Sequence, residues 1–195
     1  GDVYKRQVLR LTVDDKYSWD FAMLGVGLRY INGVGKPDML HYVESFGMEG
    51  HYDFASNRGY IWSRTFPLLK RALLLGVGQD NFAYAFPNDD YVGKENCGFN
   101  EQIVTKPHNM YLQIWVQDGL PALLAFLALY LLLFGRTIRK CFKKGKWNHS
   151  QKISLAFLCG VSGYFVAGLA NDSSICVAPV FWVLFGVAFA VLRSE

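Results

Sequence analysis

The sequence predicts an all-α integral membrane protein, in which about three C-terminal transmembrane helices follow a large extracytoplasmic loop region with short amphipathic helices. The first observation is a set of long apolar runs at residues 120–138, 153–170 and 175–192. As a helix, each of the last two runs would span roughly 27 Å, close to the ~30 Å hydrocarbon core of a bilayer. The second observation is that these runs lack the polar stripe of a soluble helix.

A short basic segment sets the predicted orientation. Residues 135–152 contain no acidic residue and seven basic ones: Arg136, Arg139, Lys140, Lys143, Lys144, Lys146 and Lys152. Because short cytoplasmic loops are enriched in Lys and Arg, we predict a cytoplasmic loop at 139–152, within a transmembrane region at 119–195. Residues 1–118 are then an extracytoplasmic loop region. Binding of this basic run to anionic lipid or nucleic acid is an alternative, but topology is the simpler interpretation.

The first residues of the chain do not resemble the start of a natural protein. The chain starts "GDVYKRQ", without Met, and this heptad resembles translated linker sequence, so residues 1–7 are treated as non-native and we expect the chain to begin within a longer protein. Cys97, Cys141, Cys159 and Cys176 have no CxxC spacing and no His at metal-ligand spacing. We therefore expect neither a disulfide framework nor a metal site.

Local patterns predict short elements before residue 119. Residues 8–13 alternate weakly, as a short strand does, and the segment from Asn57 onward follows a helical period that Pro67 should bend or break. Residues 79–107 form a long polar and aromatic loop, a kind of segment that is often functional. Asn109 is a good N-cap for a further helix ahead of the first apolar run.

Several motifs occur in an order that is typical of one family. The segments are "SNRGYIWSRTFPLLKRALLLGVGQDNF" at 56–82, "KPHNMYLQIWVQDGLPALLAFLALYLL" at 106–132 and "NDSSICVAPVFWVLFG" at 171–186. Together they resemble the O-antigen ligase and O-antigen polymerase superfamily, and the chain looks like a C-terminal fragment of such a protein. It lacks the upstream helices of that family, and an upstream arginine that family members use has no clear match.

The resemblance implies an activity and a set of partners. Family members are polytopic enzymes of the bacterial inner membrane that transfer a glycan from an undecaprenyl-diphosphate carrier to an acceptor hydroxyl during cell-surface polysaccharide biosynthesis. The implied partners are the lipid-linked glycan, a glycan or lipid acceptor and membrane lipids, with no nucleic acid, no cofactor and no metal. Ligase and polymerase differ in the acceptor, which the sequence does not distinguish.

His108 and Arg58 are the predicted catalytic residues. A neutral imidazole can accept the proton of an acceptor hydroxyl, and a position just before a helix N-terminus disfavours its charged form. A guanidinium can hold two oxygens of the leaving diphosphate. The alternatives are that His108 only orients the helix and that Arg58 contacts lipid headgroups.

Weaker candidates for substrate binding are Arg64, Arg71, Lys106 and Asp172. The three basic residues could instead contact headgroups, and Asp172 could lie in a short solvated turn at a membrane edge. Asp89 and Asp90 could hold a cation, although a solvated pair is the simpler interpretation. Aromatic residues of the loop could stack on sugars or form its core: Tyr84, Phe86, Tyr91 and Phe99.

The function that best fits these observations is a membrane glycosyltransferase of the O-antigen ligase type. A non-catalytic or transport protein, such as a lipid-linked glycan flippase, is the main alternative. Transporters keep functional charges within their helices, whereas here the candidate residues lie outside the apolar runs. An inactive fragment is the third hypothesis.

Overall fold

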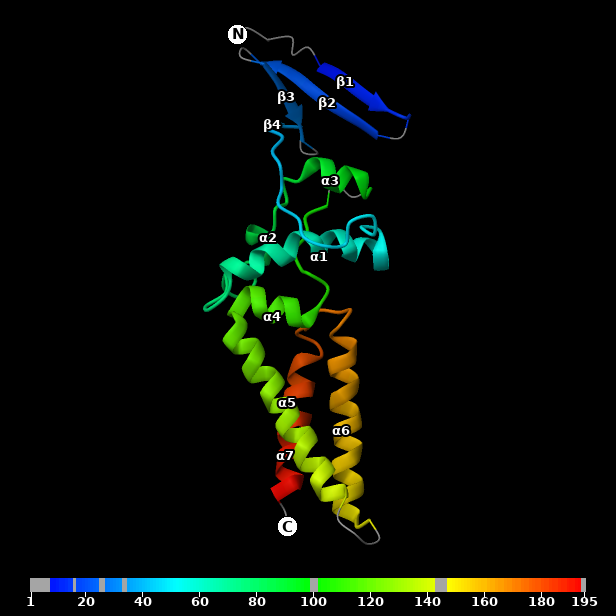
Figure 1. The fold of residues 1–195 in the computed structure, drawn as a ribbon, viewed down its shortest axis with the longest axis vertical. Coiled ribbons are helices and arrows are strands. Elements are labelled where there is room, and N and C mark those ends of the chain that lie inside the picture. The colour runs from blue at the N-terminus through cyan, green and yellow to red at the C-terminus, as the bar shows by residue number, and fades with distance from the viewer. Residues whose placement is uncertain are drawn as a thin grey trace. The chain divides into compact units, whose positions relative to one another are not determined.

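The protein is described by a computed structural model that covers residues 8–15, 17–24, 27–32, 35–98, 102–142 and 147–193 (Figure 1). The chain forms two compact units. Unit 1 comprises Gly1–Pro67 and Ala83–Thr105, and unit 2 comprises Leu68–Phe82 and Lys106–Glu195. The expectation for residues 1–7 lies outside the described residues, as do Phe99 and the lysines Lys143, Lys144 and Lys146.

A four-stranded antiparallel sheet opens unit 1, in the order β1-β2-β3-β4. The strands are β1 (Val8–Val13), β2 (Tyr17–Leu24), β3 (Gly27–Ile31) and β4 (Pro37–Asp38). Val8 pairs with Ala22 and Val13 with Tyr17. Asp14 and Asp15 between these strands have φ of 53° and 50°, a conformation that Asp adopts more readily than most residues. The strand predicted at residues 8–13 is confirmed, and the rest of the sheet was not predicted.

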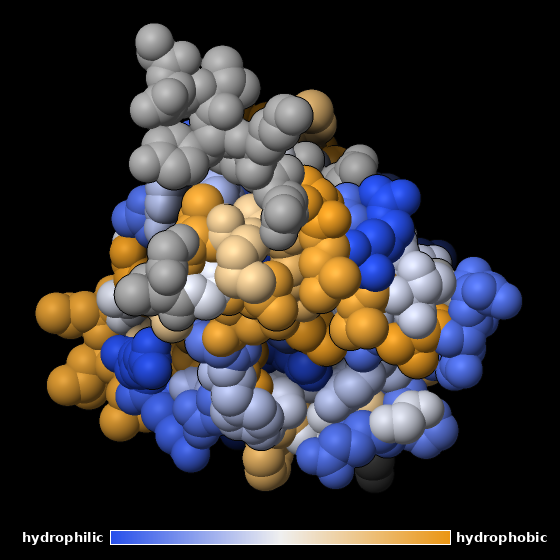
Figure 2. Space-filling model, turned by 90° about the horizontal axis from the view of Figure 1, so that it is seen from above, coloured by the Kyte–Doolittle hydropathy of each residue, from blue (hydrophilic) through white to orange (hydrophobic). Residues whose placement is uncertain are grey.

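The sheet buries little of its apolar surface. Ala22 and Tyr30 are buried, whereas other apolar residues of its strands are exposed: Val8, Leu9, Leu11, Val13, Met23 and Leu28. Figure 2 shows apolar residues in orange on the exposed surface beside polar residues in blue. The sheet is therefore held by the hydrogen bonds between its strands and by a few side-chain contacts. One of these is the contact of the Tyr30 and Tyr91 rings, whose centroids are 4.8 Å apart.

Helix α1 (Phe54–Arg71) continues through Pro67 and has its non-helical backbone at Ala55–Asn57 instead. Pro67 has no N–H to donate to the carbonyl of Ser63, four residues earlier. The backbone N–H of Phe46 donates to that carbonyl at 2.8 Å, which satisfies the freed acceptor. The short helices α2 (Phe82–Ala85) and α3 (Tyr91–Asn96) follow.

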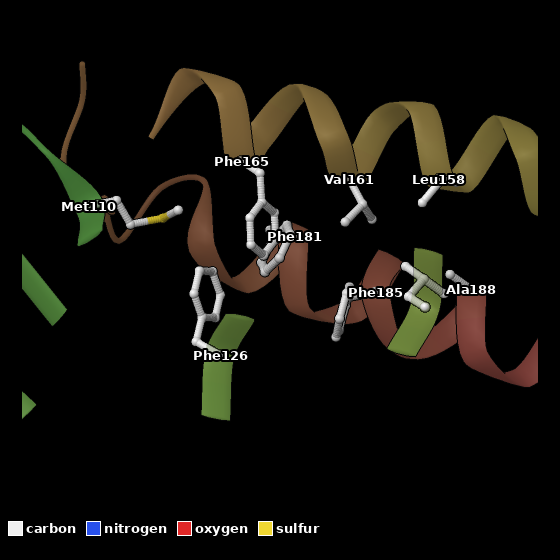
Figure 3. Close-up of a cluster of buried hydrophobic side chains, with 9 residues drawn as sticks. Met110, Phe126, Leu158, Val161, Phe165, Phe181, Phe185 and Ala188 are labelled. Atoms are coloured by element: carbon white, nitrogen blue, oxygen red, sulfur yellow. The ribbon is translucent and has the colours of Figure 1, made fainter. Parts of the chain in front are cut away.

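Unit 2 is a helical bundle. It contains α4 (Met110–Asp118), α5 (Leu120–Cys141), α6 (His149–Ala167) and α7 (Ala178–Arg193), and the last three helices contact one another. Figure 3 shows Phe126, Phe165 and Phe181 turned toward one another between these helices. Phe126 stacks on Phe165 with ring centroids 4.7 Å apart. Such aromatic pairs contribute about 0.5–1.5 kcal/mol each beyond the area that they bury.

The prediction of an all-α protein with about three transmembrane helices was wrong. The chain contains the four-stranded sheet, and within its described residues one helix, α5, is long and apolar enough to cross a membrane. Helix α7 has 16 residues, or about 24 Å at 1.5 Å per residue. It is shorter than the apolar run because residues 175–177 form a non-helical turn before the helix begins. Helix α6 begins in polar sequence, where Asn148 and Gln151 form a capping box. The boundary predicted at residue 119 stays a prediction.

Candidate functional site

The segment before α4 is fixed to the C-terminal end of α6 by backbone and cap contacts. Asn109 caps α4, because its Oδ1 accepts from the backbone N–H groups of Tyr111 and Leu112 at 3.0 Å each, as predicted. Its Nδ2 donates to the carbonyl of Leu169 at 2.9 Å, and the N–H of Met110 donates to the carbonyl of Gly168 at 2.8 Å. His108 is therefore held at the start of α4.

His108 lies against Asp172, which is the main geometric finding of the site. The imidazole Nδ1 is 2.9 Å from Oδ2 of Asp172, within the distance of an ion pair or a hydrogen bond. The His108 side chain is 47% exposed and that of Asp172 is 10% exposed. His108 has φ of 52°, a strained conformation of the kind found at functional positions. Within the described ranges, Nε2 of His108 has no hydrogen-bond partner.

Asp172 is positioned by the segment between α6 and α7. The N–H of Ser173 donates to Oε1 of Gln113 at 2.9 Å, and the hydroxyl groups of Ser173 and Tyr164 are 3.1 Å apart. Oδ1 of Asp172 is buried and has no hydrogen-bond partner in the described part of the chain. A buried carboxylate oxygen without a donor is costly, which suggests that a bound molecule supplies one.

A pocket of about 410 Å³ surrounds this pair, and Lys106, His108 and Asp172 all line it. Three of the predicted site residues therefore come together in unit 2. Arg71 belongs to the same unit, where it is exposed in the last turn of α1. Arg58 and Arg64 belong to unit 1.

Arg58 follows the left-handed stretch that opens α1. Its Nη1 donates to the carbonyl of Ala55 at 2.8 Å. Its Nε is buried and has no partner among the residues that the structure describes. Part of the guanidinium is thus anchored while another donor is unused, a state that can serve an anionic ligand.

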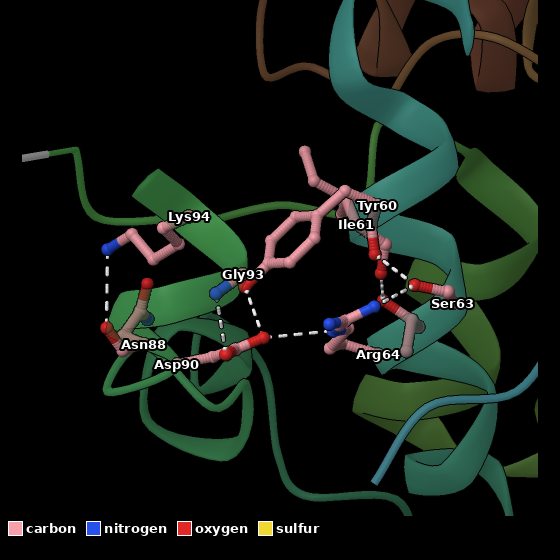
Figure 4. Close-up of polar contacts among 9 residues, drawn as sticks. Tyr60, Ile61, Ser63, Arg64, Asn88, Asp90, Gly93 and Lys94 are labelled. Atoms are coloured by element: carbon pink, nitrogen blue, oxygen red, sulfur yellow. Dashed lines mark hydrogen bonds and ion pairs between the residues drawn. The ribbon is translucent and has the colours of Figure 1, made fainter. Parts of the chain in front are cut away.

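Arg64 takes part in a buried polar cluster within unit 1. Its Nε is 2.9 Å from Oδ2 of Asp90, and the hydroxyl of Tyr60 donates to the same oxygen at 2.9 Å (Figure 4). The N–H of Gly93 donates to Oδ1 at 3.0 Å. The guanidinium also lies over the ring of Tyr60, 4.5 Å from its centroid. Burial, together with the negative charge of Asp90, raises the pKa of Tyr60 far above its usual value.

Asp89 and Asp90 were interpreted as a solvated pair, but only Asp89 is exposed to solvent. Asp90 is buried, and its carboxylate accepts the three hydrogen bonds described above. Asp89 is half-exposed, and its Oδ2 lies 3.3 Å from Nε2 of His41. Among the described residues there is no group of three or more His, Cys, Asp or Glu that could hold a metal ion. Of the loop aromatics, Phe86 is buried core and Tyr84 is exposed.

We expect the buried pair to contribute strongly to stability. Asp90→Ala would leave the charge of Arg64 buried and unpaired, which costs about 3–5 kcal/mol of unfolding free energy. Denaturation in nanodiscs followed by tryptophan fluorescence measures the loss. Asp20→Ala, which breaks the exposed Arg10–Asp20 pair, is the matched control and should change stability little. Equal losses in both variants would contradict the assignment of Asp90 as a structural residue.

Sequence reasoning missed Gln113, whose side chain anchors the backbone beside Asp172. It lies one helical turn after Asn109, so the spacing could have placed it on the same face.

A family model described as O-antigen ligase matches residues 19–127, more than half of the 195-residue chain. The chain belongs to the O-antigen ligase family. The resemblance seen in its motifs is thereby confirmed.

Searches of curated proteins and of solved structures return no match to this O-antigen ligase family member. The matched span contains Arg58, Arg64, Arg71, Lys106 and His108, and it ends before Asp172. The family is one of the bacterial inner membrane, and membership supports a function of the O-antigen ligase or polymerase type in polysaccharide biosynthesis.

Proposed function

We propose that this O-antigen ligase family member transfers a glycan from an undecaprenyl-diphosphate carrier to an acceptor hydroxyl, with His108 as the general base. The observation that supports it best is the contact of His108 Nδ1 with Asp172 at 2.9 Å, which leaves Nε2 without a partner in the described chain. With its proton on Nδ1, the neutral imidazole presents a lone pair on Nε2.

In the proposed reaction, Nε2 takes the proton of the acceptor hydroxyl while its oxygen bonds to the anomeric carbon. The bond from that carbon to the carrier diphosphate breaks, and its electron pair leaves with the phosphate. Asp172 stabilises the imidazolium that forms, as a carboxylate does in other histidine dyads. We assign Arg58 to the carrier diphosphate from its residue type, because a guanidinium can meet the negative charge that develops there, and within unit 2 Lys106 and Arg71 contribute positive potential. Arg64 is not included, because its guanidinium is buried against Asp90.

A transfer assay tests this function and the role of Arg58. The full chain is reconstituted in liposomes with lipid-linked glycan and acceptor, and the new glycosidic bond is measured. We expect Arg58→Ala to abolish detectable transfer and Arg58→Lys to lower it by more than roughly tenfold, because an ammonium cannot reproduce a two-pronged contact. Glycan that changes leaflet without forming a new bond would favour the flippase alternative, and full activity of Arg58→Lys would reduce Arg58 to a diffuse contact.

We also propose that residues before 119 lie outside the cytoplasm in a multi-pass membrane protein. The basic run between α5 and α6 supports this orientation. In a background with the four native cysteines replaced, a membrane-impermeant thiol reagent should label Glu95→Cys in intact cells and leave Gly145→Cys unmodified. The reverse pattern would overturn the orientation and remove the site from the carrier's outer leaflet.

A further inference from the structure

A second pocket, of about 470 Å³, adjoins the pocket of His108 within unit 2. The two pockets share the lining residues Lys106, Met110, Tyr164 and Ser174. A molecule bound in the second pocket therefore borders the pocket that His108 lines. The lining of the second pocket comes from α4, the segment 79–80, the first two turns of α5, Tyr164 of α6, and the segment 173–175 with the start of α7.

Gln117 is the feature that points to a ligand. The residue is 3% exposed, and its backbone carbonyl is fixed by a hydrogen bond from the N–H of Gly78 at 2.9 Å. Its side-chain amide lines the pocket and makes no hydrogen bond to another described residue. Buried amides are nearly always hydrogen-bonded in native proteins, and the Gln117 amide is not one of the fully enclosed polar atoms without a partner, so its donor and its acceptor are open to a molecule in the pocket.

The polar neighbours of Gln117 are already oriented, and some of their polar atoms have no hydrogen-bond partner among the residues that the structure describes. Oε1 of Gln113 accepts from Ser173, so its Nε2 remains as a donor. Nε2 of Gln79 donates to Oδ1 of Asp118 at 2.6 Å, so Oε1 of Gln79 and Oδ2 of Asp118 remain as acceptors. Hydroxyl groups both donate and accept, and a sugar ring presents several of them side by side. Fixed donors beside fixed acceptors match that pattern.

Aromatic side chains complete the lining and suit the apolar C–H face of a sugar. Phe126, Phe181 and Trp182 all line the pocket. Trp182 is half-exposed, and its ring packs edge-on against Phe126 with centroids 5.9 Å apart. A ligand site that combines an apolar wall with a few placed polar groups is the usual arrangement for small-molecule recognition.

Charge selects among sugars. Asp80 and Asp118 contribute two carboxylates to this pocket, and Lys106 contributes one ammonium. The balance is negative, which disfavours an anionic sugar. We infer that this pocket binds a neutral sugar unit of the acceptor and presents its hydroxyl to His108. This inference rests on the proposed function, because it names the substrate class of the same site.

Saturation-transfer NMR on the chain in lipid nanodiscs tests the pocket directly. The probes are methyl glucoside, methyl galactoside and methyl glucuronide. At least one neutral glycoside should show saturation, and the glucuronide should show little. Gln117→Leu should weaken the neutral signal roughly fivefold, the effect of losing one hydrogen bond, whereas Gln102→Leu, at an exposed position, should not. Equal signals in Gln117→Leu and wild type, or equal saturation of the glucuronide, would overturn the inference.

Two further variants keep the test decisive if Gln117→Leu fails to fold. Trp182→Leu removes part of the half-exposed aromatic wall and should also lower the neutral signal. Asp80→Asn suits the left-handed backbone at this position, where φ is 57°, and should raise glucuronide binding at least about twofold by removing a repelling charge. Unchanged binding in both variants would overturn the assignment.

The inference and the proposed function can fail separately. His108→Ala should retain sugar binding, because the pocket does not depend on the imidazole. A neutral glycoside should inhibit transfer in competition with the acceptor. Competition with the carrier-linked donor instead would overturn the acceptor assignment. If the chain binds no sugar but its transfer activity still requires His108, the sugar pocket is rejected and the base is kept. If His108→Ala binds sugar and transfers glycan normally, the base is rejected and the pocket is kept.

Discussion

Replacing His108 with alanine is expected to lower glycan transfer by roughly 10²- to 10⁴-fold, the usual contribution of a positioned general base. An acceptor hydroxyl is a poor nucleophile while it keeps its proton. No other described group that lines this pocket offers an equivalent lone pair at the position of Nε2. The measurement is single-turnover transfer in liposomes with saturating lipid-linked glycan, so that the bond-forming step is observed instead of product release.

The conformation of His108 dictates the control for this experiment. At φ of 52°, alanine adds backbone strain, whereas asparagine tolerates the left-handed region. His108→Asn should therefore keep the cap of α4 and the folded state, and it should be as inactive as the alanine variant. If His108→Asn turns over at nearly the wild-type rate, the base role is lost and His108 is a residue that orients α4.

Elements that depend on local chemistry were predictable from the sequence. The N-cap at Asn109 and the start of α5 at Leu120 follow from a polar cap and a Gly-Leu-Pro turn before an apolar run. The strand Val8–Val13 follows from alternation. The family also follows from motifs, because they preserve the order of residues along the chain and do not require contacts to be known.

Other features depend on information that a hydropathy pattern does not carry. Strand β2 is an exception, because Tyr17, Trp19 and Phe21 alternate with polar residues in the period of a strand, and this pattern could have predicted it. Hydropathy also counts apolar residues without regard to where a helix begins. The third apolar run starts three residues before α7 does, and the resulting helix is too short for the prediction that was made.

The site was predictable as a set of residue types and not as a geometry. His108 and Asp172 were both candidates, but they are far apart in the sequence and no spacing rule joins them. Their contact depends on Asn109 and Gln113 anchoring the segment after α6. Similarly, Arg64 was predicted from its charge alone, and its burial against Asp90 required the fold of the loop at 86–93 to be known.

Replacing Asp172 with asparagine is expected to lower transfer by roughly 10³- to 10⁴-fold, although the change is nearly isosteric. The carboxylate accepts from Nδ1 in the proposed state, which places the lone pair of the neutral imidazole on Nε2. An asparagine amide that turns its Nδ2 toward Nδ1 donates instead of accepting. The proton then resides on Nε2, and the imidazole cannot take the proton of the acceptor hydroxyl.

Asp172→Ala separates this tautomer effect from loss of charge. Alanine removes the partner of Nδ1 without imposing the wrong tautomer, so a fraction of the imidazole keeps its lone pair on Nε2. We therefore expect Asp172→Ala to retain more activity than Asp172→Asn. ¹⁵N NMR of labelled histidine in nanodiscs should show the Nδ1–H tautomer of His108 in the wild type and the Nε2–H tautomer in Asp172→Asn. Equal activity of the two variants, with an unchanged tautomer, would mean that Asp172 acts by its charge and does not orient the base.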